Sequence, residues 1–132
     1  MRLYTQVGYR SPAYCSSMGK CLLSCLSGTE LNKALYACPF ERFTPHTITN
    51  FNDFKKLLKV VRERGWAMDD QEYLLEHRCV GAPVFDYRGD AISSVSASGT
   101  TAEITDERIP HIIEEVKHAA ELLSQRMGYS RE

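Results

Sequence analysis

The spacing of apolar and polar residues along the chain predicts four helices. In each, apolar side chains recur at three- and four-residue intervals, the pattern of a helix with one buried face. Serine, threonine or asparagine side chains precede the first three as caps, and Gly65 ends the third. Pro110 falls in the first turns of the fourth, where proline is tolerated. The predicted helices span residues 16–26, 29–38, 52–65 and 105–127.

Alternation of polar and apolar residues predicts strands around these helices. Residues 2–8 fit a strand, and residues 66–68 begin another that leads into an acidic loop at 69–73. Residues 77–99 contain two strands around a turn from Asp86 to Gly89. Strand, three helices, strands and a long helix, in that order, predict an α+β fold in which helices pack on an antiparallel sheet.

Composition limits the classes of protein to consider. A chain of 132 residues that is 43% hydrophobic and 25% charged fits one domain with a real core. The net charge is −1 and the basic residues are scattered, so we expect no nucleic-acid surface on this chain. No apolar run approaches the ~20 residues of a membrane helix, and the first residues do not resemble a signal peptide. Five cysteines, an odd number, favour a reducing, cytoplasmic setting.

The second strand of the predicted hairpin carries three serines on one face, Ser94, Ser96 and Ser98. Two interpretations are open: the hydroxyls face water, or they line a cavity for a small polar molecule. If Asp86 to Gly89 form the loop, then Cys79 pairs with Ser96 and His77 with Ser98. Opposed residues share a side of the sheet, so these groups would converge on one patch, although a one-residue slip would separate them.

A helix start and an acidic turn are further candidates for binding. Ser17, Met18 and Gly19 lie at the start of the first helix, where unpaired backbone N–H groups suit a carboxylate. The serines could equally be plain caps. Glycine is costly inside a helix, so Gly19 indicates close approach of a ligand or of another backbone segment. The acidic residues 69–72 are either acceptors for a ligand hydroxyl or a solvated turn.

No metal or cofactor is expected. Cys21 and Cys25 are four residues apart on one helix, but no histidine lies near them in the sequence. They fit buried small apolar side chains better than zinc ligands.

Three stretches together resemble the isocitrate lyase regulator (IclR) family of bacterial transcription factors. SSMGKCLLSCL is similar to that family's T-A-x-G-K-A-L-L-A helix. FTPHTITN and LLKVVRERGWAMDDQE are similar to its T-x-x-T-I and I-R-x-x-G-(Y/W)-x-x-D-x-E motifs. RCVGAPVFDYRGDAISSVSASG is similar to its C-(I/L/V)-A-A-P-(V/I)-x-D-x-x-G strand pair, and the last helix ends at Met127-Gly128 as the family's does.

The resemblance implies one effector-binding domain over residues 1–132, with a GAF-like or profilin-like fold. It implies that the winged helix-turn-helix, and the helix and strands that open the family's effector domain, lie outside this chain. DNA would then be bound only through that missing domain, in a homodimer or tetramer, and no membrane is involved. The implied effector is a small organic acid, a 2-oxo or sugar acid. The effector-binding residues implied by motif and spacing are Ser17, Met18, Gly19, Asp69, Cys79, Ser96 and Ser98.

Three hypotheses for function follow. The first is a sensor in which the effector carboxylate meets the helix start and the serine hydroxyls, and Asp69 accepts from a ligand hydroxyl. The second is an enzyme that uses the Cys79 thiol, which would need a basic or cationic neighbour. The third is an assembly module in which the hairpin and long helix only make oligomers. We favour the sensor and expect no enzymatic activity.

Overall fold

The structure is a computed structural model that describes residues 7–131. The strand predicted over residues 2–8 falls almost wholly outside the described residues. The described elements, in chain order, are a 3-10 turn η1 (Ala13–Cys15), α1 (Ser17–Ser24), α2 (Gly28–Leu35), α3 (Phe51–Arg64), β1 (Ala67–Asp70), β2 (His77–Phe85), β3 (Ala91–Thr100) and α4 (Ile109–Arg126).

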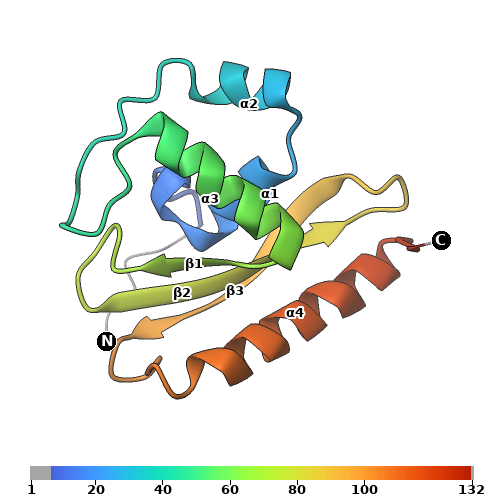
Figure 1. Cartoon of the computed structure of the whole chain (residues 1–132). Helices are drawn as coiled ribbons and strands as arrows, with labels where there is room; N and C mark the ends of the chain where they lie inside the picture. Colours follow the sequence, from blue (N-terminus) through green and yellow to red (C-terminus); the bar gives the residue numbers. More distant parts are fainter. Residues whose placement is uncertain (1–6, 132) are drawn as a thin grey trace.

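The three strands form an antiparallel sheet in the order β1-β2-β3. The long helix α4 packs against β2 and β3 on one side, and α1 lies across all three strands on the other, with α3 packed against α1 (Figure 1). Helices therefore cover both sides of the sheet, and the predicted α+β fold is confirmed.

The caps predicted for the first three helices are present. Ser16 accepts the Gly19 amide at the start of α1, and Ser27 forms a reciprocal capping box with Glu30 at the start of α2. Asn50 caps α3, which ends at Gly65 with a left-handed φ of 83°. Local sequence signals thus set these helix starts.

The second helix ends at Leu35 rather than at residue 38, and two further predicted boundaries are wrong. The acidic residues Asp69 and Asp70 belong to β1 rather than to a loop, because they pair with Cys79 and Arg78 of β2. The last helix begins at Ile109 rather than at residue 105, since residues 105–108 form a turn before it. Strand pairing therefore lengthens β1 beyond its apolar residues, and a turn delays the start of α4.

The predicted hairpin exists, but its register differs by two residues. Phe85 pairs with Ala91 rather than Asp90, and a bulge at Val84/Phe85 shifts the ladder once more. Cys79 therefore pairs with Ser98, not with Ser96. Because side chains alternate along a strand, a shift of two leaves Cys79, Ser96 and Ser98 on their predicted face.

Apolar side chains form separate clusters on the two sides of the sheet. Below it, Val80, Ala82 and Val84 of β2 pack against Val116 and Ala120 of α4. Above it, one cluster joins aromatic and aliphatic residues of η1, α2 and α3, and another contains Cys21, Val61 and Ala67. Cys21 is fully buried there, as a small apolar side chain would be.

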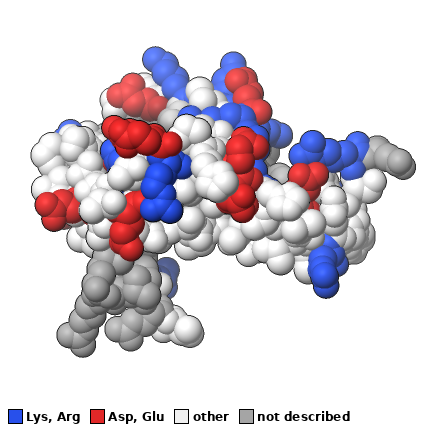
Figure 2. Space-filling view, turned by 90° about the horizontal axis from the view of Figure 1, so that it is seen from below, with Lys and Arg blue, Asp and Glu red and all other residues white. Residues whose placement is uncertain are grey.

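The surface carries charges of both signs. Figure 2 shows acidic and basic side chains interspersed on the face seen from below, beside a broad area without either. No helix among residues 7–131 is both long and apolar enough to cross a membrane.

Candidate functional site: the α1-facing side of the sheet

Two rows of paired residues cross the sheet on the side that faces α1. In the first row, Asp69 of β1 pairs with Cys79 of β2, which pairs with Ser98 of β3. The next row contains Gly81 opposite Ser96. Directly opposed residues in an antiparallel sheet point to the same side. The candidate thiol, carboxyl and both hydroxyls therefore share one face.

The start of α1 lies directly against this face. A Cβ built on Gly81 would be 3.1 Å from the Ser17 hydroxyl oxygen, so α1 approaches β2 as closely as a glycine permits. Ser17 is buried by this contact, whereas the Met18 side chain is 44% exposed. The start of α1 and the side of the sheet that carries Ser96 and Ser98 are thus adjacent.

Gly19 is required by a close approach of the chain's own backbone. A Cβ at this position would lie 2.7 Å from Cα of Ala13 in η1. Of the two explanations for this glycine, the structure selects backbone approach. The Gly19 amide is also occupied, because it donates to the Ser16 hydroxyl at 2.9 Å. Amides still without an intrahelical partner belong to Ser17 and Met18.

The Cys79 thiol contacts two polar groups. Its sulfur is 3.1 Å from the Ser98 hydroxyl oxygen and 3.7 Å from Nδ1 of His77. Burial raises the pKa of Cys79 to about 11, with a small opposing effect of the Ser98 hydrogen bond. The thiol is therefore protonated at neutral pH and is a poor nucleophile, which removes the chemical basis of the enzyme hypothesis.

Asp69 is buried. It is 3% exposed, and its Oδ1 accepts the Glu72 amide at 2.9 Å. Burial raises the pKa of Asp69 to about 7, although the Glu72 amide opposes this rise. Near neutral pH this carboxyl can therefore either donate or accept a hydrogen bond.

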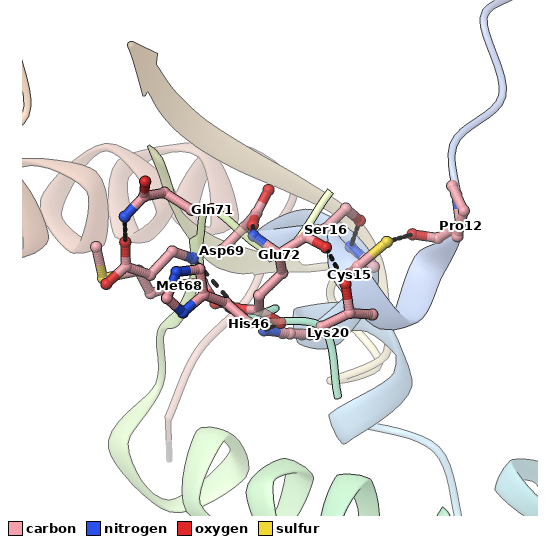
Figure 3. A network of polar contacts seen from close by, with 12 residues as sticks. Pro12, Cys15, Ser16, Lys20, His46, Met68, Asp69, Gln71 and Glu72 are labelled. Atoms are coloured by element: carbon pink, nitrogen blue, oxygen red, sulfur yellow. Dashed lines mark hydrogen bonds and ion pairs between the residues drawn. The ribbon is translucent and has the colours of Figure 1, made fainter. Parts of the chain in front are cut away.

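A buried ion pair connects α1 to the residues after β1, and it was not predicted from the sequence. Lys20 is 1% exposed, and its Nζ lies 2.6 Å from Glu72 Oε1 and 2.8 Å from the Met68 carbonyl oxygen (Figure 3). The burial of Lys20 could have been predicted from the helical spacing of Ser17, Lys20 and Ser24, because this spacing puts a lysine in a stripe of small residues.

The loop before α3 is tied to the same acidic turn. The Thr47 hydroxyl donates to the Glu72 carbonyl oxygen, and the Thr44 hydroxyl donates to the Gln71 carbonyl oxygen, both at 2.6 Å. These bonds join α1, β1 and the 44–47 loop into one unit.

A groove of about 880 Å³ lies elsewhere, between the ends of α3 and α4 at the hairpin end of β2. None of the predicted site residues lines it. At the hairpin end of β2, Pro83 has no backbone N–H. The Phe85 amide there donates to the Ser124 hydroxyl of α4 at 3.0 Å. No group of histidine, cysteine, aspartate or glutamate side chains among residues 7–131 is arranged to hold a metal ion.

Comparison with known proteins agrees with this architecture. The family model described as the bacterial transcriptional regulator IclR C-terminal domain matches residues 1–125. The regulator KdgR of Escherichia coli is 33% identical over 98% of this chain and 49% of its own length. The solved IclR of Thermotoga maritima superposes with a TM-score of 0.89 at 33% identity, covering 96% of this chain and 51% of that one. An inducer-binding domain of PobR from Acinetobacter, a double mutant solved with 3-hydroxybenzoic acid, has a TM-score of 0.84 at 26% identity over 89% and 69% of the two chains.

The fold and these matches define the class as the effector-binding part of a bacterial transcriptional regulator. This chain belongs to the IclR family, and it corresponds to that family's C-terminal domain. It spans about half the length of the curated relatives that it matches. Those relatives are transcriptional regulators.

Proposed function

We propose that the α1-facing side of the sheet binds a small carboxylate, a 2-oxo acid or a sugar acid. The observation that carries this proposal is the row formed by Cys79 and Ser98 next to the start of α1. Backbone amides of Ser17 and Met18, with the partial positive charge of the helix start, suit an anion. The hydroxyls of Ser96 and Ser98 add donors without filling the space.

The remaining residues of the site have separate roles in this proposal. Cys79 forms the wall beside the carboxylate, and its protonated thiol adds no negative charge that would repel it. Asp69 accepts from a ligand hydroxyl when ionised, through the carboxylate oxygen not bonded to the Glu72 amide. The exposed Met18 side chain closes over the bound acid. Gly19 lets α1 pack against η1, and Gly81 lets the same helix come close to β2.

A relative supports the choice of a carboxylate. The PobR inducer-binding domain was solved with 3-hydroxybenzoic acid, which is itself a small organic acid. Its overall similarity to this chain means that a pocket for such an acid can be built on this fold.

In the whole protein, we propose that binding is passed to DNA. The curated relatives are helix-turn-helix regulators about twice as long as this chain. A winged helix-turn-helix outside this chain would contact DNA, and the effector would shift the balance between two arrangements of a dimer or tetramer.

Calorimetry on the 132-residue chain tests the proposed site. Pyruvate, D-gluconate and 3-hydroxybenzoate serve as probes, each compared with its carboxamide. We expect at least one acid to bind, and Ser96→Ala combined with Ser98→Ala to weaken its binding at least about tenfold, since each lost hydroxyl is a hydrogen bond to an ion.

Ser93→Ala is the matched control. Ser93 is exposed and lies on the same strand, but its side chain is on the face opposite to Ser96 and Ser98. Removal of the Ser93 hydroxyl should therefore leave the affinity unchanged. Binding of no acid by the wild-type chain, or equal binding by the double variant, would refute the proposed site.

A further inference from the structure

Asp69 receives one hydrogen bond from the protein, although a buried lysine lies close to it. Its Oδ1 accepts the Glu72 amide at 2.9 Å. The Lys20 ammonium group donates to the Met68 carbonyl oxygen and to both carboxylate oxygens of Glu72, at 2.6 to 2.8 Å (Figure 3). These acceptors are as many as an ammonium group has protons, so Lys20 has no hydrogen bond left for Asp69. A single backbone amide is thus the donor to Asp69 among residues 7–131.

The second oxygen of Asp69 is available to a ligand. Oδ2 takes part in no hydrogen bond among residues 7–131. Every fully enclosed side-chain nitrogen or oxygen of those residues has a partner, so Oδ2 must border a space that solvent can enter. Asp69 lies in one row with Cys79 and Ser98, two strand spacings or about 10 Å from Ser98. A small acid with a hydrogen bond at each end fits this span.

We infer that Asp69 selects between 2-oxo acids and 2-hydroxy acids according to whether it carries a proton. This inference rests on the proposed function, because it names the group of the effector that Asp69 contacts in that site. A keto oxygen only accepts hydrogen bonds, so it needs the protonated carboxyl as its donor. A hydroxyl group donates or accepts, so it can bond to either form. A 2-oxo acid is therefore bound together with a proton, whereas a 2-hydroxy acid is not.

The surroundings of Asp69 let this carboxyl change its charge near neutral pH. Burial raises the pKa of Asp69 to about 7, against the opposing effect of its backbone hydrogen bond. The titratable groups that face it are Glu72 and Asp70 of its own segment, Lys20 of α1, Cys15 of η1 and Cys79 of β2. The two acidic neighbours are held in ion pairs, with Lys20 and with Arg78. Burial raises the pKa of both thiols, to about 12 for Cys15 and about 11 for Cys79, so both stay protonated.

Pyruvate and lactate form a matched pair of probes for this selection. They carry the same carboxylate on the same carbon chain, and they differ in a keto oxygen against a hydroxyl. Calorimetry on the 132-residue chain gives both affinities at pH 6 and pH 8, with the enantiomer of lactate that binds better. We expect the ratio of pyruvate to lactate affinity to fall about tenfold between these pH values, because the donor form of Asp69 is depleted. Effects of pH on recognition of the shared carboxylate cancel in this ratio.

The protons taken up on binding can also be counted. The same titrations at pH 8, repeated in two buffers of different ionisation enthalpy, give that number for each acid. We expect pyruvate to take up about one proton and lactate much less. This count uses the wild-type chain, so it tests the inference whether or not a variant at position 69 folds.

Asp69→Asn separates this carboxyl from other titrating groups. The asparagine amide offers a donor and an acceptor at any pH, so the ratio of the two affinities should no longer depend on pH. Asp53→Asn, at an exposed position of α3, is the matched control and should keep the tenfold change of the wild type.

The outcomes separate this inference from the proposed function. A ratio that is independent of pH in the wild type, or a pH-dependent ratio that persists in Asp69→Asn, would overturn the selection by Asp69 and leave the site intact. Binding of another acid but of neither pyruvate nor lactate would also overturn it. If the wild-type chain bound no acid at all, the site itself would be refuted and the inference with it.

Discussion

Asp69 is a carboxyl group that lies inside the protein next to the buried Lys20–Glu72 pair (Figure 3). Its main stabilising partner is the Glu72 amide, which does not fully offset the loss of water around a charge. Its pKa is consequently raised to about 7. Between about pH 4 and pH 7 the folded protein holds a proton that the unfolded chain has released, so the protein becomes less stable as pH rises through this window.

The substitution Asp69→Asn removes this titration. The asparagine is uncharged at any pH, and its side-chain oxygen can still accept the Glu72 amide. We expect the free energy of unfolding at pH 8 to increase by about 1 kcal/mol and its decrease between about pH 4 and pH 7 to flatten. Urea denaturation at a series of pH values measures both. The same change at the exposed Asp53 should leave the pH dependence in place, and a steep dependence in Asp69→Asn would contradict the assignment.

At the scale of elements, the position of α1 depends on two glycines. Gly19 lets α1 pack on η1, and Gly81 lets the same helix pack on β2. The cap of α1 comes from Ser16, which connects η1 directly to the helix. The start of α1, where the carboxylate is proposed to bind, is therefore held between a turn and a strand. Small changes in either contact would move its amides relative to the serine face.

Gly19→Ala tests this packing. The new methyl group would meet the Ala13 backbone, so we expect a loss of about 2 kcal/mol in the free energy of unfolding despite the better helix propensity of alanine. Gly28→Ala in α2 is the matched control: its new methyl group would meet no atom within 4 Å, and stability should stay equal or increase by up to about 1 kcal/mol. Thermal unfolding followed by circular dichroism measures both variants, and an equal effect of the two would contradict this account.

At the scale of the molecule, α4 closes the lower side of the sheet and also covers an open strand edge. β2 extends beyond the end of β1, which leaves its last residues without a neighbouring strand on that side among residues 7–131. The Ser124 hydroxyl accepts the Phe85 amide at 3.0 Å and donates to the Ala120 carbonyl oxygen at 2.8 Å. Phe85 also packs on Tyr129 beyond the helix, with ring centroids 5.2 Å apart. The Ser124 side chain thus connects α4 to the end of β2 by hydrogen bonds.

Ser124→Ala should weaken this connection. The Phe85 amide would lose its partner at a part-buried edge, which costs about 1 to 3 kcal/mol. We expect the midpoint of urea unfolding to fall accordingly and the Phe85 amide to exchange its hydrogen faster. Ser93→Ala, at an exposed position of β3, should change stability by less than about 0.5 kcal/mol. Unchanged hydrogen exchange at Phe85 would show that Ser124 does not protect this edge.

Much of this protein was determined by its local sequence. Helix caps and apolar spacing act between residues a few positions apart, so α1, α2 and α3 could be predicted nearly to their ends. The side on which Ser96, Ser98 and Cys79 lie follows from strand alternation alone, which a register error of two residues does not change. The IclR likeness is likewise carried by the order of short motifs.

Other features were decided only by tertiary structure. The pairing of Cys79 with Ser98 depends on a bulge at Val84/Phe85, and the pKa of Asp69 depends on how much protein surrounds it. The Lys20–Glu72 pair joins residues 52 positions apart. Such features arise when separate elements pack together, and spacing along the chain does not encode the distances between them. The sequence therefore determined which groups face the site, and packing determined which of them touch.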